Sequence, residues 1–446
     1  MNNRKRPLIT GIVCVFALSA GLCSAKTAGP VRCRVELDRD VLYAEREQTA
    51  VVKITLDADR PLNVKERPPV NLSIVLDRSG SMSGKKLERA KEAAIEALHR
   101  LDGRDIFSLV VYNHKVKTVV EAQSASNTEW IEKRIRSIGS NGNTALFAGV
   151  SQGAAEVRKN IEENFVHRII LLSDGLANVG PSSASDLGRL GAGLLKEGIS
   201  VTTVGVGNDY NEDLMARLSR KSDGNTYFVE NSRGLARIFK EELGDLLSVV
   251  ARKVKLIIEC PDGVRPLRII GREGRIHSGN VELYLNQLYG GQEKFALVEV
   301  KLPAVKAGEK REIAVARVRY ENVFTEDTES ATGRVDGAFS ENRKTVEESE
   351  NVKVRASYEV NLNAMAQEKA IKLADEGKAK EAAKVLKESA QKLDKVGKKY
   401  GDSALVKRAR QIEVQAESIE QEGLSKGGRK ALRSESYQTI RQQRAR

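Results

Sequence analysis

Residues 70–82, VNLSIVLDRSGSM, decide the fold of this 446-residue chain. The stretch begins with a mostly apolar run, which is typical of a buried strand in a mostly parallel sheet. The run ends at Asp77, and the small, polar, glycine-bearing residues that follow let the chain curl so that Asp77, Ser79 and Ser81 face one point. Three oxygen-bearing side chains suit a hard cation there, although a D-x-S-x-S stretch also forms turns and helix N-caps in proteins without a metal.

Two more segments point to the same place. Gly142 and Asn143 form a turn before a predicted helix, and Thr144 offers its hydroxyl at the start of that helix. Residues 169–175, IILLSDG, form a second apolar strand that ends in a carboxylate, Asp174. Because the carboxyl ends of parallel strands meet at one edge of an open α/β sheet, where ligands bind, we expect the three segments to converge.

The three segments, in this order, resemble the metal-ion-dependent adhesion site of the von Willebrand factor type A domain. All five oxygen ligands of that site have a counterpart in the chain: Asp77, Ser79, Ser81, Thr144 and Asp174. The resemblance also covers DIFSLVVY at residues 105–112 and TVGVG at residues 203–207, so it extends beyond the ligands. It implies a Rossmann-like domain that binds Mg²⁺, or Mn²⁺ or Ca²⁺, at one edge of its sheet.

The resemblance also implies how such a site acts. In the family, neutral hydroxyl oxygens hold the ion directly, and the residues that correspond to Asp77 and Asp174 lie largely behind bound waters. Neutral hard oxygens suit Mg²⁺, Mn²⁺ or Ca²⁺ and are not what Zn²⁺ or copper require. An ion with mostly uncharged ligands keeps much of its charge, so its open position attracts an anionic oxygen, typically the carboxylate of an Asp or Glu of a protein partner.

Strands and helices alternate through residues 68–247. The spacing of apolar residues predicts strands at 70–76, 106–112, 166–173, 199–206 and 226–229, and helices at 83–101, 130–138, 145–161, 183–196, 211–220 and 232–247. This alternation predicts an α/β fold with a doubly wound, mostly parallel sheet.

Apolar and polar residues alternate on both sides of this region. The two-residue period predicts antiparallel strands with one wet face, at 31–37 and 51–56 before it and at 252–259, 281–285, 295–302 and 313–320 after it. Because the first group is too small to be stable alone, we expect residues 26–67 and 248–350 to form one β-sandwich into which the α/β domain is inserted. Residues 321–350 are polar and are predicted mainly as loop.

Secreted bacterial type A proteins that resemble the inter-alpha-trypsin inhibitor heavy chains and the calcium-activated chloride channel regulators carry a β-rich region in a comparable place. Our chain is similar to them in this respect. The similarity implies a fold neighbourhood and no particular activity.

Residues 351–446 are predicted to be helical. Residues 368–386 resemble the helical hairpin of a tetratricopeptide-type repeat. One copy does not make a solenoid, so an ordinary helical bundle packed on the sandwich is the alternative. The last stretch, residues 426–446, is basic with few apolar residues, and we expect a solvated tail there, with binding of an anionic cell-surface component as a further role.

Residues 1–25 have the features of a secretory signal peptide. A basic start, RKR at residues 4–6, precedes an apolar stretch at 8–22 and a small-residue cleavage site, CSA at 23–25. A lipid anchor on Cys23 and an uncleaved membrane anchor are the alternatives, but Leu22 is bulky for a lipoprotein signal. Cleavage would leave an exported mature chain without a transmembrane segment, in the periplasm or outside the cell.

The mature chain would be basic. The full chain has 74 Lys and Arg against 61 Asp and Glu, and loss of the three basic residues in the signal peptide would lower the net charge from +13 to +10. A basic chain suggests nucleic acid as a partner, but the export signal and the 4% content of aromatic residues argue against this class of partner. Anionic surface polymers or a membrane surface are better candidates.

Cleavage would also remove two of the four cysteines and leave Cys33 and Cys260. In an oxidising compartment these thiols can form a disulfide, which would tie the two parts of the sandwich together; two buried, reduced thiols are the alternative. The chain has no C-x-x-C and no H-E-x-x-H motif, and its four histidines are scattered, so neither a zinc site nor a metalloprotease is expected.

The sequence predicts a binding module and no enzyme. No motif positions a nucleophile or a general base: Ser79 lacks a base, and neither His114 nor His167 lies in a motif. We therefore expect an exported protein that mediates divalent-cation-dependent protein–protein interaction or adhesion. The alternatives are a structural scaffold with a silent metal site, whose C-terminal helices bind the partner, and a metal-assisted hydrolase.

Overall fold

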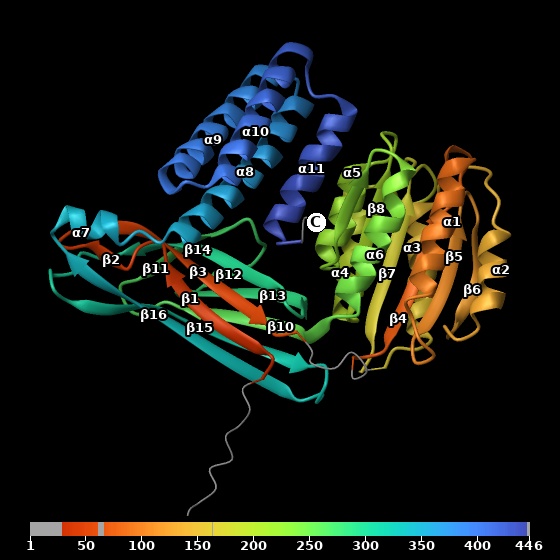
Figure 1. The fold of residues 1–446 in the computed structure, drawn as a ribbon, viewed down its shortest axis with the longest axis horizontal. Coiled ribbons are helices and arrows are strands. Elements are labelled where there is room, and N and C mark those ends of the chain that lie inside the picture. Colours follow the sequence, from red (N-terminus) through yellow and green to blue (C-terminus); the bar gives the residue numbers. More distant parts are fainter. Residues whose placement is uncertain (1–28, 61–66, 163, 444–446) are drawn as a thin grey trace, which may run out of the picture.

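A computed structural model describes residues 29–60, 67–162 and 164–443. The predicted signal peptide, residues 1–25, lies outside the described residues. The described chain forms an α/β domain, a pair of β-sheets and a bundle of helices, and its last helix lies between the bundle and the α/β domain (Figure 1). None of the described helices has the length and apolar character needed to cross a membrane.

The α/β domain contains a six-stranded sheet in the order β6-β5-β4-β7-β8-β9. All neighbouring strands are parallel except β5 and β6. The strands are β4 (Val70–Asp77), β5 (Ile106–Tyr112), β6 (Val116–Ser124), β7 (Val166–Ser173), β8 (Ile199–Val206) and β9 (Thr226–Val229). The predicted mostly parallel, doubly wound sheet is confirmed. Edge strand β6 is not among the predicted strands, because only Val120 in it is buried and its apolar alternation is weak.

Helices cover both faces of this sheet, and each face has its own apolar core. One face carries α1 (Lys85–Leu98), α2 (Thr128–Arg136) and α6 (Leu235–Leu246), and the other carries α3 (Leu146–Arg158), α4 (Ala184–Lys196) and α5 (Glu212–Lys221). Strand β4 serves both cores, because Leu72 and Ile74 join the first and Val75 joins the second. The amide nitrogen of its polar Asn71 donates to two carbonyl oxygens at the end of α3, at 2.8 and 2.9 Å, so this buried donor is paired.

Two sheets form the β-sandwich, in the orders β1-β3-β14-β11 and β12-β13-β10-β15-β16-β2. Their strands are β1 (Val31–Leu37), β2 (Val41–Tyr43), β3 (Gln48–Ala58), β10 (Val249–Glu259), β11 (Arg265–Ile270), β12 (Arg275–His277), β13 (Asn280–Tyr289), β14 (Glu293–Leu302), β15 (Lys310–Asn322) and β16 (Thr328–Ser340). Strand β3 pairs with β14 over its whole length, so strands from before and after the α/β domain share one sheet. A single apolar core draws residues from both sheets.

The prediction of a loop over most of residues 321–350 is wrong. Strand β16 pairs along β15, and the short helix α7 (Arg343–Glu348) follows it. The sequence of β16, TESATGRVDGAFS, is polar and small, so no apolar alternation marks it as a strand. Its Gly333 allows a close approach of the other sheet, because a Cβ there would lie 2.6 Å from the carbonyl oxygen of Cys33.

Helices α8 (Val352–Asp375), α9 (Ala379–Tyr400) and α10 (Ser403–Glu422) pack around an apolar core of their own. Gly377 and Gly401 adopt positive φ angles, 77° and 67°, in the turns between them. Helix α8 also rests on the sandwich, where Val354 packs with Val51 and Leu297. Helix α8 packs on α9 and α9 packs on α10, so the predicted helical hairpin is present as part of a small group of helices.

The prediction of a solvated basic tail is wrong for its described part. Residues Lys426–Ile440 form helix α11, which packs against α8 and against α5 and β9 of the α/β domain. Its basic side chains pair with carboxylates of the chain: Arg429 with Glu212, Asp213 and Asp375; Lys430 with Glu212; Arg433 with Asp213 and Glu368. Periodicity did not reveal this helix, because it docks mainly through charged and polar side chains.

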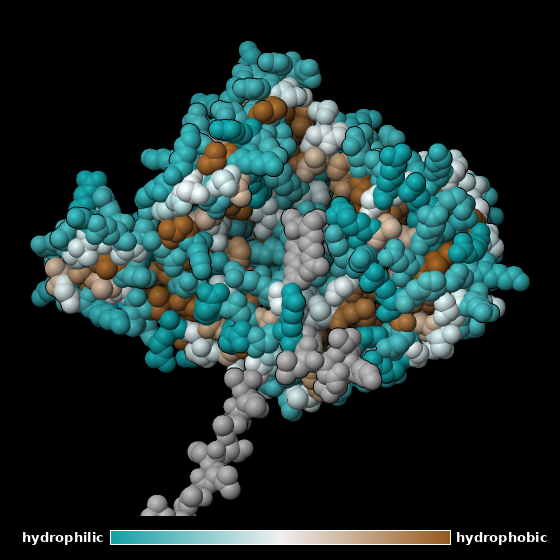
Figure 2. All heavy atoms as spheres, viewed as in Figure 1, coloured by the Kyte–Doolittle hydropathy of each residue, from teal (hydrophilic) through white to brown (hydrophobic). Residues whose placement is uncertain are grey.

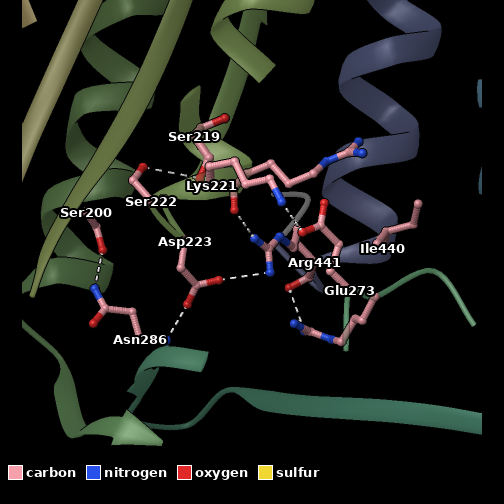
Figure 3. A network of polar contacts seen from close by, with 12 residues as sticks. Ser200, Ser219, Lys221, Ser222, Asp223, Glu273, Asn286, Ile440 and Arg441 are labelled. Atoms are coloured by element: carbon pink, nitrogen blue, oxygen red, sulfur yellow. Dashed lines mark hydrogen bonds and ion pairs between the residues drawn. The ribbon is translucent and has the colours of Figure 1, made fainter. Parts of the chain in front are cut away.

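The end of α11 joins three parts of the molecule around Asp223, in the turn between α5 and β9 (Figure 3). The carboxylate of Asp223 forms an ion pair with Arg441 at 2.9 Å and accepts from the backbone N–H of Asn286 in β13 at 2.5 Å. Arg441 also donates to the carbonyl oxygen of Arg220 in α5 at 2.6 Å. Helix α11 therefore connects the helical bundle, the sandwich and the α/β domain.

The predicted disulfide between Cys33 and Cys260 is absent, and both residues are free thiols. The Cys33 Sγ lies 3.9 Å from the carbonyl oxygen of Ala316 in β15, so it is directed at the backbone of the facing sheet. Cys260 directly follows β10. Burial raises the pKa of each thiol to about 11, which keeps both protonated at neutral pH. The structure thus has the alternative of two reduced thiols.

Candidate metal centre

The five predicted ligands lie together at the carboxyl edge of the α/β sheet. Asp77 is the last residue of β4, and Asp174 directly follows β7, the neighbour of β4 in the sheet. The strand order reverses between β4 and β7, so this edge is a topological switch point, where open α/β sheets bind ligands. Of the five residues only Ser81 is exposed.

Hydrogen bonds fix the carboxylate of Asp77. Its Oδ1 accepts from the backbone N–H of Ser79 at 2.8 Å, and its Oδ2 accepts from the hydroxyl of Ser173 at 2.7 Å. The hydroxyl oxygens of Ser79 and Ser81 lie 3.1 Å apart. The loop after β4 therefore curls as the sequence predicts and turns both serine hydroxyls towards one space.

Two asparagines that the sequence did not single out hold the loop around Thr144. The backbone N–H of Thr144 donates to Oδ1 of Asn178 at 2.9 Å, and the N–H of Asn178 donates back to the Thr144 carbonyl at 3.2 Å. The carbonyl oxygen of Asn113 accepts from the N–H of Ala145 at 2.7 Å. Both asparagines act on a loop distant in sequence, so no local motif announces them.

The donor set fits a hard divalent cation. A Cβ built on Gly175 would lie 3.1 Å from Oγ1 of Thr144. The same position is 3.6 Å from Oγ of Ser81 and 3.8 Å from Oγ of Ser79, so three hydroxyl oxygens border a space that a side chain at residue 175 would fill. Such oxygens, backed by two carboxylates, are what Mg²⁺, Mn²⁺ and Ca²⁺ prefer. The described residues hold no cluster of three or more His, Cys, Asp or Glu that offers a different metal site.

The charge at this edge is unusual for a protein interior. The side chains of Asp77 and Asp174 are fully buried. Burial raises the pKa of Asp77 to about 6, and the neighbouring charge of Asp174 adds to the rise, whereas hydrogen bonds from Ser79 and Ser173 oppose it. A cation near the two carboxylates would favour their ionised forms.

Among the described residues, Lys86 is the basic side chain that forms an ion pair with a buried carboxylate at this edge, and sequence reasoning missed it. Lys86, in the first turn of α1, places its Nζ 2.5 Å from Oδ2 of Asp174, while Ser81 donates to Oδ1 of the same carboxylate at 2.6 Å. The available signal was the position of Lys86 at the start of the helix that follows the D-x-S-x-S loop.

Two histidines named in the sequence lie at opposite ends of the sheet. His114 is exposed and its ring packs against Gly142, because a Cβ there would lie 2.2 Å from Nδ1. No hydrogen bond joins this ring to the five predicted ligands in the described part of the chain. His167 is buried near the start of β7, far along the strand from Asp174.

Fold and site together define a class of domain. Residues 71–241 match the family model of the von Willebrand factor type A domain. The chain therefore carries a von Willebrand factor type A domain, inserted in a β-sandwich and followed by helices. The expected resemblance to this family is confirmed.

Among curated proteins, the chain is 28% identical over 297 residues to the uncharacterised protein sll0103 of Synechocystis, which covers 64% of the chain and 68% of that protein. It is 27% identical over 281 residues to the uncharacterised protein YfbK of Escherichia coli, covering 61% of the chain and 48% of YfbK. It is 30% identical over 195 residues to inter-alpha-trypsin inhibitor heavy chain H2 of Sus scrofa, covering 42% of the chain and 21% of the heavy chain. The chain thus spans about two thirds, a half and a fifth of these relatives.

Two solved structures share the fold over most of the chain. A von Willebrand factor type A protein from Catenulispora acidiphila superposes with a TM-score of 0.67 at 18% identity and covers 86% of this chain and 90% of its own. The ArnB paralog VWA2 from Sulfolobus acidocaldarius gives a TM-score of 0.62 at 16% identity, covering 93% and 99%. At such identities the likeness shows the fold alone, and its coverage extends beyond the type A domain.

Proposed function

We propose that this protein is an exported interaction or adhesion protein whose type A domain binds one Mg²⁺, or Mn²⁺ or Ca²⁺, and through it a carboxylate of a protein partner. Type A domains are modules that commonly mediate protein–protein interaction. The observation that carries the proposal is the convergence of three hydroxyl oxygens and two buried carboxylates at one edge of the sheet.

The residues divide the work at such a site. Ser79, Ser81 and Thr144 would hold the ion through neutral oxygens, and Asp77 and Asp174 would balance its charge from behind. When bound, the ion supplies a positive charge with an open position for an anionic oxygen. The chain itself contributes a set of oxygen ligands, which hydrogen bonds hold in position before the ion or the partner binds.

The surface beside the site favours a partner that combines an acidic group with an apolar one. Leu176, two residues after Asp174, is 57% exposed. On the face shown in Figure 2, hydrophobic residues occur in small separate patches among hydrophilic ones. Recognition centred on one charged contact with a small apolar neighbour suits this surface better than a broad apolar interface.

The localisation and the class of partner follow from the same proposal. We infer export to the periplasm or the cell exterior from residues 1–25, and a non-enzymatic role because type A relatives are mostly interaction modules. Nucleic acid is not a proposed partner. Binding of an anionic cell-surface component by the C-terminal tail loses support within residues 426–443, because Arg429, Lys430, Arg433 and Arg441 already pair with carboxylates of the chain and only Lys426 is left exposed without an ion pair among the described residues.

Titration calorimetry tests the metal site directly. We expect the wild-type protein to bind one Mg²⁺ or Mn²⁺, and Asp77→Ala to abolish this binding while the domain stays folded by circular dichroism. Asp209→Ala, which removes an exposed carboxylate from the loop after β8, is the matched control and should bind the ion as the wild type does. Unchanged metal affinity in Asp77→Ala would refute the proposed site.

Chelation separates the proposal from its two alternatives. Capture of partner proteins from an extracellular fraction should require Mg²⁺ and should fail with EDTA or with Asp77→Ala. A structural scaffold with a silent metal site would capture its partner equally well in EDTA. Turnover of simple ester or peptide substrates that requires the ion would instead support the metal-assisted hydrolase.

A further inference from the structure

A lysine next to the proposed metal site forms an ion pair with a buried carboxylate of that site. Helix α1 begins after Gly84, and its first two residues are Lys85 and Lys86. Lys85 is exposed, and no ion pair joins it to a described carboxylate. Lys86 turns back over the metal loop and forms an ion pair with Asp174 at 2.5 Å.

Each oxygen of the Asp174 carboxylate has a partner in this arrangement. Its Oδ1 accepts from the hydroxyl of Ser81 at 2.6 Å, and its Oδ2 accepts from the ammonium of Lys86. The Asp174 side chain has 0% exposure, whereas that of Lys86 has 36%. In the described part of the chain, Lys86 is the basic side chain that forms an ion pair with either of the two buried carboxylates of the site.

The ammonium of Lys86 also approaches the loop after β8. A Cβ built on Gly207, in the loop after β8, would be 3.9 Å from Lys86 Nζ. The ammonium therefore lies near the carboxyl ends of β7 and β8, although Lys86 belongs to the helix that follows β4. Because the lysine stem is flexible and the head is partly exposed, the ammonium has a way out to solvent.

We propose that Lys86 is the internal counter-ion of the metal site: it neutralises Asp174 when no metal is bound, and it opposes metal binding until it moves away. This inference rests on the proposed metal site. The hydroxyl of Ser81 donates to Asp174 in the same arrangement, so one ion pair and one hydrogen bond together hold the carboxylate that backs the site.

The physical basis is competition between cations for one carboxylate. An ammonium and a divalent ion on the same buried carboxylate repel each other over a few ångströms, in surroundings less polar than water. Metal entry therefore requires the ammonium to give up its contact and move to solvent. Without Lys86, no ammonium would compete with the metal for Asp174. The two carboxylates would then bind a divalent ion more tightly.

The closing experiment compares Mn²⁺ binding to the full chain by electron paramagnetic resonance or calorimetry in three proteins: wild type, Lys86→Met and Lys85→Met. We expect Lys86→Met to lower the Kd for Mn²⁺ about tenfold. Lys85→Met removes the same charge one residue away, and we expect its Kd to stay within about twofold of wild type, because an exposed charge is screened by salt.

A second readout guards against a variant that is merely unstable. In EDTA, thermal unfolding of Lys86→Met should begin at a lower temperature than that of the wild type, because the buried Asp174 has lost its cation. Saturating Mn²⁺ should raise the Tm of Lys86→Met more than that of the wild type and remove most of the difference. Lys85→Met should follow the wild type in both conditions.

The outcomes separate this inference from the proposed function. Mn²⁺ binding in the wild type with an equal or weaker affinity in Lys86→Met would overturn the role of Lys86 and leave the metal site standing. Absence of Mn²⁺ binding in all three proteins would overturn both. Binding that is detectable only in Lys86→Met would support the counter-ion role in its strongest form.

Discussion

The two ends of the type A sheet both hold buried charges, but the rest of the protein closes only one of them. At the amino end, Arg168 of β7 is fully buried and pairs with Glu242 of α6 at 3.2 Å. It also donates to Gln287 and Tyr289 of β13 at 2.8 and 2.7 Å, so the sandwich covers this end of the sheet and supplies two partners for the guanidinium. At the carboxyl end, Asp77 and Asp174 are both buried, and Lys86 is the basic side chain that pairs with one of them, Asp174, in the described part of the chain.

The difference shows how to tell a structural polar cluster from a binding site. A buried charge that pairs with an opposite charge of the chain, and that another part of the chain covers, contributes to stability and specificity of packing. Two buried charges of the same sign that border an exposed surface, with a single opposite charge beside them, keep a capacity for a cation. By this criterion the Arg168 cluster is structural, and the Asp77–Asp174 edge is the candidate site.

The largest effect on stability is expected at the amino end of the sheet, which the sandwich covers. Arg168→Met should lower the free energy of unfolding by about 3 to 5 kcal/mol, because Glu242 would stay buried without its cation. Urea unfolding of the metal-free protein measures this. The double variant Arg168→Met/Glu242→Gln should recover part of the loss, and a single variant as stable as the wild type would remove the distinction between the two ends.

The next effect is a pH dependence at the same end. Burial lowers the pKa of His167 from its ordinary value of 6.5 to about 4, and the positive charge of Arg252 contributes. The unfolded chain takes up a proton below about pH 6.5 while the folded chain does so only near pH 4, so stability falls as the pH decreases through this window, by about 3 kcal/mol in total. Unfolding of His167→Gln between pH 4 and 7 should lack this component; an identical profile would contradict the assignment.

A smaller loss of unfolding free energy is expected from a change in helix α11, which packs against one side of the type A domain. Arg429 of α11 pairs with Asp213 at 2.6 Å and Asp375 at 2.7 Å, and its side chain is 20% exposed. Arg429→Met should cost about 2 kcal/mol of unfolding free energy, because the pairs are partly desolvated. The control Arg343→Met removes an 82% exposed partner of Glu347 and should change nothing measurable. Equal effects of the two variants would mean that α11 docks without help from its charges.

The smallest effect on folding belongs to the open end. Asp77→Asn should change the unfolding free energy of the metal-free protein by no more than about 1 kcal/mol, because burial already disfavours the charge, and the amide oxygen can accept from Ser79 while the amide nitrogen donates to the hydroxyl of Ser173. The same variant should lose Mn²⁺ binding in calorimetry. A loss of stability as large as that of Arg168→Met would show that the open end is structural too.

The fold and the candidate site were predictable where the signal is local. Residues 70–82 combine an apolar strand with a D-x-S-x-S turn, and IILLSDG repeats the pattern, so periodicity and strand-end chemistry together indicate one edge of one sheet. The structure brings all five predicted residues to that edge. Their metal remains a prediction.

The errors arise where stability comes from contacts that are distant in sequence. Strand β16 forms because β15 pairs with it along its length, and nothing in its polar sequence announces this. Helix α11 docks through ion pairs with residues more than two hundred positions away, such as Glu212 with Lys430. Lys86 is one of two adjacent lysines, and only the course of α1 decides which of them reaches Asp174.

Strand β4 has a mechanical consequence for a protein that holds on to a partner. Its eight residues, roughly 26 Å long, carry Asp77 at one end and follow residues 67–69 at the other end. Arg67, which is 5% exposed and paired with Asp105 at 2.6 Å, holds the chain in place just before the strand begins. A pull on the metal edge would run lengthwise along a central strand bonded on both sides to β5 and β7, so its hydrogen bonds would share the load in shear and would not open one after another.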